Sequence, residues 1–158
     1  MSSVAEQALD AVKARLAVPN GSSPYTYDLT ATGTVRIGVP DPAQGGPVPA
    51  VYLWAGPLAI RYSEEMGSWH QELTLYVHAR VPSSTSDPED RVKAGIRILD
   101  DLLLTLRADR DLGSGIVLDS PPTDVNSWDL SGVFGMDGLS GCKLTIKPWW
   151  IALSSEGA

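Results

Sequence analysis

The sequence has little cysteine and no long hydrophobic run. Its single cysteine, Cys142, excludes a disulfide within the chain and a zinc site built from thiolates. Cys142 lies in an alternating apolar segment, which predicts a small buried side chain. No apolar stretch approaches the roughly 20 residues of a membrane-spanning helix, and Glu6 and Asp10 interrupt the N-terminal segment. We therefore expect a soluble protein without a signal peptide or a membrane partner, and the cysteine content fits a reducing cytosol.

Clustered positive charge is also lacking. The chain has 12 lysines and arginines against 19 acidic residues, which gives a net charge of −7. Binding to nucleic-acid phosphates requires a basic surface, so the composition argues against a DNA- or RNA-binding protein of the usual kind. An acidic surface repels DNA and is useful where DNA must pass without sticking.

What is present indicates an ordinary globular protein. Apolar residues make up 43% of the 158 residues and charged residues 20%. A chain of this length can bury a core that needs neither a metal nor a disulfide. We expect one domain over residues 1–153 and a loose C-terminal tail at 154–158.

The segment 69–81 has the pattern of a long strand with one apolar and one polar face, because side chains of a strand alternate in direction. Apart from Gln71, the first face is apolar: Trp69, Leu73, Leu75, Val77, Ala79 and Val81. The second face is polar and is expected to be exposed to solvent: His70, Glu72, Thr74, Tyr76, His78 and Arg80.

Two amphipathic helices are predicted. Asp87 and Pro88 start one that runs to about Arg107. Its apolar residues recur every three or four positions and predict a buried face: Val92, Ile96, Leu99, Leu103 and Leu106, widened by Ile98 and Leu102. The other covers residues 3–17, with an apolar stripe of Ala5, Leu9, Val12 and Leu16.

Further strands are predicted where apolar residues recur at every second position: 25–39, 51–62, 116–118, 128–134 and 142–150. Gly56-Pro57 predicts a bulge or tight turn, and 63–68 a polar turn. The proline- and glycine-rich segment 40–49 is expected to be an exposed hairpin-type loop. The fold is therefore predicted to be α+β, a mainly antiparallel sheet packed against two amphipathic helices, with long Pro/Gly-rich loops.

No catalytic, cofactor or metal-binding pattern stands out. His70 and His78 would lie roughly 26 Å apart on a straight strand, too far to share a metal. Cys142 has no histidine near it in the sequence. Glu64 and Glu65 lack the ligand spacing of a calcium loop, and we interpret them as a solvated turn. The glycines between 132 and 141 match no nucleotide-binding fingerprint and fit turns around a hairpin.

Adjacent tryptophans, Trp149 and Trp150, point to a protein interface. They would lie on opposite faces of a strand, so one of them can lie outside the core. Exposed aromatic side chains are enriched at protein–protein interfaces.

The order and texture of these segments resemble the tail terminator (tail completion) proteins of long-tailed bacteriophages. The resemblance covers most of the chain: Val4–Ala17, the Pro-Ala-Val-Tyr-Leu run at 49–53, Trp69–Val81, Ile98–Leu103, the Leu112-Gly113 turn and the strand at 142–152.

The resemblance implies a structural virion protein without enzymatic activity or cofactor. Six copies would form a ring on the last disc of tail-tube proteins, end polymerisation of the tube and provide the docking surface for the head connector at the neck. DNA would pass through the lumen without specific binding. The protein would be found in the host cytoplasm during assembly and then in the virion tail.

The partner contacts are expected in the loop 40–49, the acidic turn, the polar strand face and the tryptophan pair: Pro42, Gln44, Pro47, Glu64, Glu65, His70, Glu72, Tyr76, His78, Arg80, Trp149 and Trp150. One alternative is another neck, head–tail joining or tail-tube protein. A second is a small-molecule-binding domain or enzyme that uses the sheet face or Cys142 in a deep pocket.

Overall fold

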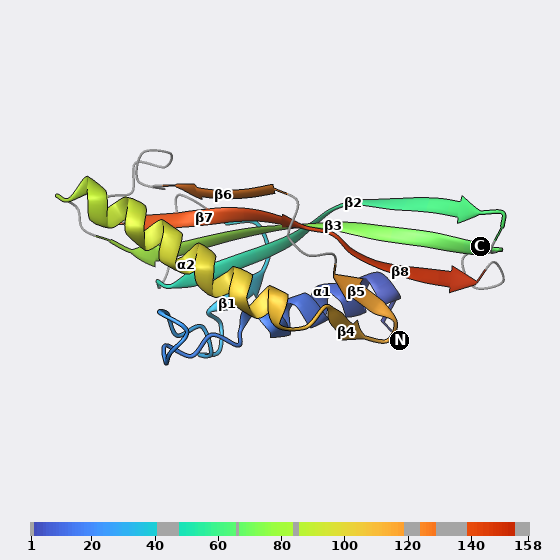
Figure 1. Ribbon diagram of the computed structural model, residues 1–158, viewed down its shortest axis with the longest axis horizontal. Coiled ribbons are helices and arrows are strands. Elements are labelled where there is room, and N and C mark those ends of the chain that lie inside the picture. Colours follow the sequence, from blue (N-terminus) through green and yellow to red (C-terminus); the bar gives the residue numbers. More distant parts are fainter. Residues whose placement is uncertain are drawn as a thin grey trace.

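The computed structural model describes residues 2–40, 48–65, 67–83, 86–118, 124–128 and 139–153, with the backbone alone at 124–128 and 153. Its elements in chain order are α1 (Val4–Leu16), β1 (Val35–Ile37), β2 (Ala50–Ser63), β3 (Ser68–Pro82), α2 (Pro88–Ala108), β4 (Asp111–Gly113), β5 (Ile116–Leu118), β6 (Asp124–Trp128), β7 (Leu139–Ile146) and β8 (Pro148–Leu153). The predicted α+β class is confirmed: a mainly antiparallel sheet carries two helices (Figure 1).

Strand β3 is the centre of the sheet. It pairs with β2 on one side and, on the other, with β8 over Ser68–Glu72 and β7 over Leu75–Pro82. The closing segment, predicted as one strand, is divided at Lys147 into β7 and β8. Strand β6 pairs with β7, and β5 with β8. All these pairings are antiparallel.

Helix α1 begins with a capping box. The Ser3 side chain accepts a hydrogen bond from the Glu6 N–H, and the Glu6 carboxylate accepts one from the Ser3 N–H. The helix buries Ala8, Val12 and Leu16, whereas Ala5 and Leu9 are half-buried. The predicted stripe is therefore rotated slightly from the side that meets the core.

Helix α2 begins where the sequence predicts, with Asp87 accepting from the Glu89 N–H and Pro88 in the first turn. Its predicted buried face is confirmed at Ile98, Leu102 and Leu106 and is wrong at Val92 and Ile96, which are exposed. Apolar residues lie on more than one side of this helix, so periodicity allowed both choices. The buried side includes Ala94 and Gly95, whose small size permits close packing on the sheet.

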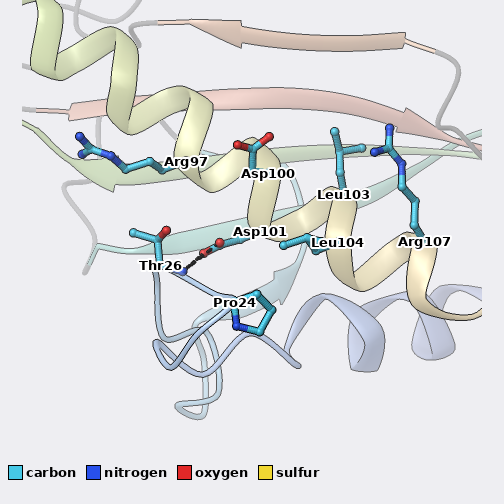
Figure 2. A pocket seen from close by; sticks show the side chains of 8 residues that line it. All are labelled: Pro24, Thr26, Arg97, Asp100, Asp101, Leu103, Leu104 and Arg107. Carbon is cyan, nitrogen blue, oxygen red and sulfur yellow. Dashed lines mark hydrogen bonds between the residues drawn. The ribbon is translucent and has the colours of Figure 1, made fainter.

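The strand predicted in the segment before β1 does not form, because the buried carboxylate of Asp101 binds the backbone of this segment. Asp101 of α2 is 1% exposed and accepts hydrogen bonds from the N–H groups of Thr26 and Tyr27 at 2.8–3.1 Å (Figure 2). Leu29 follows and is buried, whereas only Val35–Ile37 forms a strand. The alternating apolar residues in 25–29 therefore belong to a loop that is tied to α2 at Thr26 and Tyr27, and not to a strand of the sheet.

The connection between β1 and β2 is not a hairpin, contrary to the prediction for 40–49. Val35–Ile37 pairs in parallel with Val51–Leu53, and parallel neighbours cannot be joined by a hairpin turn. Residues 41–47 lie outside the described residues, as does most of the strand predicted at 128–134. The tail at 154–158 also lies outside them.

The other local predictions for β2 and β3 are confirmed. The register shifts between Ala55 and Leu58, so Gly56-Pro57 forms a bulge. Ser63 pairs with Ser68 at the turn of the hairpin. Cys142 is fully buried, and its partner in the register is Ala79. The core lies between the helices and the face of β3 that carries Leu73, Leu75, Val77, Ala79 and Val81.

Candidate interaction surface

Three strands continue beyond the helices and form a projecting arm. We define the arm as residues 58–63 of β2, 68–73 of β3 and 149–153 of β8, which are paired with one another throughout. Figure 1 shows these strands running past both helices to one end of the molecule. The arm is therefore a sheet that the helices leave largely uncovered.

One face of the arm continues the hydrophobic core into solvent. Leu58, Ile60 and Tyr62 are 40%, 51% and 47% exposed. Leu58 is paired with Leu73 of the core, and directly paired residues of an antiparallel sheet share a face. Tyr62 packs its ring 4.8 Å from that of Trp69. Apolar surface of this kind on a protein commonly marks an interaction site.

The cover of this face ends at the start of α1. Val4 and Ala5 border a hollow of about 470 Å³ whose other walls include Leu58 and Trp150. Trp150 is 4% exposed there, whereas Ile60, which pairs with Gln71 from the other side of β3, is 51% exposed. The helix thus covers this face at β8 and leaves it largely uncovered at β2.

The opposite face of the arm carries a second aromatic contact. His70 stacks on Trp149 with ring centroids 4.9 Å apart and an angle of 15° between the planes. Ile151, which pairs with His70, is 48% exposed. The prediction that Trp149 and Trp150 lie on opposite faces, with one outside the core, is confirmed by a half-buried Trp149 and a buried Trp150.

The outer edge of β2 lacks a neighbouring strand within the described part of the chain. Strand β1 pairs only with Val51–Leu53, whereas β2 continues to Ser63. An edge of this kind presents unpaired N–H and C=O groups that another chain can extend. Glu64 and Glu65 follow at the tip of the hairpin, both exposed as predicted.

The polar face of β3 is not solvent-exposed along its whole length. His78 and Arg80 are each 2% exposed, so their predicted exposure is wrong. Arg80 donates to the Tyr52 hydroxyl at 2.5 Å, and its guanidinium lies 4.9 Å from the centre of that ring. Burial, aided by the charges of Lys143 and Arg80, lowers the pKa of His78 to about 4. The sheet is therefore covered on both sides here, and Thr74 and Tyr76 are half-buried.

The groups considered for chemistry are buried and separated. Burial raises the pKa of the Cys142 thiol to about 12. Cys142 pairs with Ala79 on the core face, whereas the neighbouring His78 points to the other side of the sheet. Among the residues that the structure describes, no cluster of His, Cys, Asp or Glu is arranged to hold a metal. Neither described helix combines the length and hydrophobicity that a membrane crossing requires.

The structure brings part of the predicted contact set together on the arm: Glu64, Glu65, His70, Glu72, Trp149 and Trp150. Tyr76 lies nearer the body, beside Trp54. Pro42, Gln44 and Pro47 lie outside the described residues.

Sequence reasoning missed the exposed apolar row on β2. A signal was present, because a strand of 14 residues spans about 46 Å and a helix of 13 residues about 20 Å. The short helix cannot cover the long hairpin.

No protein-family model matches the chain, and no curated protein matches it. The function must therefore be inferred from the geometry of the arm and the resemblance described above.

Proposed function

We propose that the protein is a structural subunit that assembles with copies of itself into a ring, through its arm. The observation that carries this proposal is the half-exposed apolar row of the arm beside the free edge of β2. Contact with another chain would remove the apolar row from water and provide partners for the edge.

A single contact through the arm is expected to be weak, and closure of a ring would strengthen it. Burying Leu58, Ile60 and Tyr62 fully would stabilise a contact by a few kcal/mol, at about 25 cal/mol per Å² of apolar area. That is weak for an isolated pair, given the entropy lost on association. In a closed ring each copy makes two contacts, and the final contact forms within one assembly, which strengthens the whole.

Within this class we propose a phage tail terminator. A six-membered ring would cap the tail tube, end its polymerisation and dock the head connector, in the host cytoplasm first and then in the virion neck. The net charge of −7 supports a lumen that lets DNA pass without binding it. Another neck, head–tail joining or tail-tube protein would use the same arm, and the size of the assembly distinguishes these alternatives.

We propose no catalytic role. The enzyme alternative relies on a perturbed thiol or histidine beside a substrate pocket. Burial in the sheet accounts for the shifted pKa values of both Cys142 and His78, and the two groups lie on opposite faces.

Light scattering and negative-stain imaging test the proposal, on the protein alone and with purified tail tubes. We expect particles of about six times the 16.8 kDa chain mass for the wild type, either free or on tubes. The double variant Ile60→Ser/Tyr62→Ser should stay monomeric, because it removes two of the three residues of the apolar row while its exposed positions leave folding intact.

A matched control removes apolar area elsewhere. Val18 and Ile37 are 48% and 47% exposed on the body of the protein, close to the values at Ile60 and Tyr62. The Val18→Ser/Ile37→Ser variant should assemble like the wild type. A wild type that remains monomeric with and without tail tubes would contradict the proposed function. Long tubes or twelve-membered rings would indicate a tube or neck protein.

A further inference from the structure

A second surface feature lies on α2, away from the arm. A hollow of about 350 Å³ opens between α2 and the segment 24–26. Pro24 and Leu104 contribute apolar walls, and Arg97 and Arg107 lie toward its two ends along the helix (Figure 2). We call this hollow the α2 groove. Leu104 is 44% exposed, so its wall is open to solvent.

Two arginines give the groove a positive group toward each end. Arg107 is exposed and makes no ion pair with any residue that the structure describes. Arg97 faces the Tyr27 side chain and lies 3.9 Å from Asp90, a loose contact. Asp101 is buried, and its carboxylate is used by two backbone N–H groups. Asp100 is exposed on the same helix, so the residues lining the groove carry two positive and two negative charges, with the two arginines toward its ends.

The tip of the arm carries charges opposite to those of the two arginines. Glu64 and Glu65 are consecutive and exposed, with the apolar Tyr62 and Ile60 directly behind them. A two-stranded hairpin is about 10 Å wide with its side chains, since its strands lie about 4.8 Å apart. Arg97 and Arg107 are separated by about 15 Å along the helix, at 1.5 Å per residue. The tip therefore fits between the two arginines.

We propose that the arm tip of one copy docks in the α2 groove of a second copy. Glu64 and Glu65 would meet Arg97 and Arg107, and Tyr62 would pack on Leu104 and Pro24. This inference rests on the proposed function, because it names the contact that joins neighbouring subunits.

The placement of the two surfaces makes the contact directional. In Figure 1 the tip of the β2–β3 hairpin lies at one end of the long axis. The segment 24–26 and the turns of α2 beside it, which form the α2 groove, lie in the other half of the molecule. The tip of a copy is thus remote from its own groove. Each copy gives one tip and receives another, and a head-to-tail contact of this kind generates a ring when its rotation closes.

Charge reversal tests the docking. The tip variant is Glu64→Lys/Glu65→Lys, and the groove variant is Arg97→Glu/Arg107→Glu. Each variant alone places like charges against each other and should raise the concentration needed for assembly at least tenfold. An equimolar mixture should assemble like the wild type, because every tip then meets a groove of opposite charge in an alternating ring.

The control variant Asp10→Lys/Glu89→Lys changes net charge by the same amount as the tip variant, at exposed acids away from both surfaces. It should assemble normally, and thermal unfolding should show that all variants fold. Sizes are measured by light scattering, with images of the mixture.

The outcomes separate this inference from the proposed function. Wild-type rings that tolerate both reversals, or reversals that the mixture does not rescue, overturn the docking and leave the ring standing. Rescue of an open filament or a dimer supports the docking and overturns the ring. A wild type that never associates, even with tail tubes, overturns both.

Discussion

A single carboxylate fixes the segment before β1. Asp101 is one helical position from Asp100, yet the first is buried on two backbone N–H groups and the second is exposed. Aspartate therefore has a structural role at position 101 and contributes to the surface at position 100.

Replacing Asp101 with alanine should lower the free energy of unfolding by about 2–4 kcal/mol, because it leaves the buried N–H groups of Thr26 and Tyr27 without acceptors. Urea unfolding measures the change. Asp100→Ala is the matched control and should stay within about 0.5 kcal/mol of the wild type. Equal effects at the two positions would contradict the role assigned to Asp101.

The stability of the protein should depend on pH through His78. Its pKa in the folded state is about 4, below the ordinary value of 6.5. As the pH falls, the unfolded chain takes up the proton first, so the contribution of neutral His78 is complete above about pH 6.5 and is lost progressively down to pH 4. The wild type should therefore lose more stability across this interval than His78→Gln.

Urea unfolding at several pH values measures this difference. His70→Gln serves as the control, because His70 lies on the arm and is only half-buried. Parallel pH profiles for the wild type and His78→Gln would show that His78 contributes nothing to the dependence.

At the scale of elements, the length of the hairpin determines what the protein offers to a partner. Strands β2 and β3 have 14 and 15 residues, whereas α1, which ends before the outer part of these strands, has 13 residues with a rise of about 1.5 Å each. The bulge at Gly56 lies between the covered and the uncovered parts of β2. Bulges bend a strand and increase its twist, so this position helps to aim the arm.

Gly56→Ala should destabilise the protein by about 1–2 kcal/mol through overpacking. A Cβ atom at this position would lie 2.5 Å from Cε2 of Tyr76, whose ring packs 5.8 Å from that of Trp54. The second substitution Tyr76→Leu should remove most of the penalty in a double-mutant cycle measured by urea unfolding. Additive effects of the two substitutions would mean that the backbone at Gly56, and not the Tyr76 ring, is the constraint.

At the scale of the whole molecule, net charge sets the expected behaviour toward DNA. With 19 acidic against 12 basic residues, the protein repels a polyanion. We expect no retardation of duplex DNA in a gel at about 0.15 M salt and micromolar protein, where clustered lysines and arginines would otherwise neutralise phosphates. The tip variant, whose net charge is more positive than that of the wild type by four, is compared with the wild type in the same gel. Binding by the wild type would contradict a lumen that DNA passes freely.

Several features of this fold follow from the sequence alone because they depend on neighbours along the chain. Alternation predicts β3, Asp87 and Pro88 start α2, and the apolar setting of Cys142 predicts its burial. Gly56-Pro57 and the polar turn after Ser63 interrupt and end β2 as expected. These are properties of local backbone preference and of side-chain periodicity.

Only the tertiary structure decides which surfaces are covered. Period two assigns His78 to the polar face of β3, but it cannot show that this face is covered at His78 and exposed at the arm. Period 3.6 allowed two faces of α2, and close packing through Ala94 and Gly95 selected one of them. Alternation at Tyr25, Tyr27 and Leu29 mimics a strand until Asp101 takes the N–H groups of Thr26 and Tyr27. The arm itself arises because the long β2–β3 hairpin and the short helix α1 pack together at one end of the molecule. No local sequence pattern predicts this arrangement.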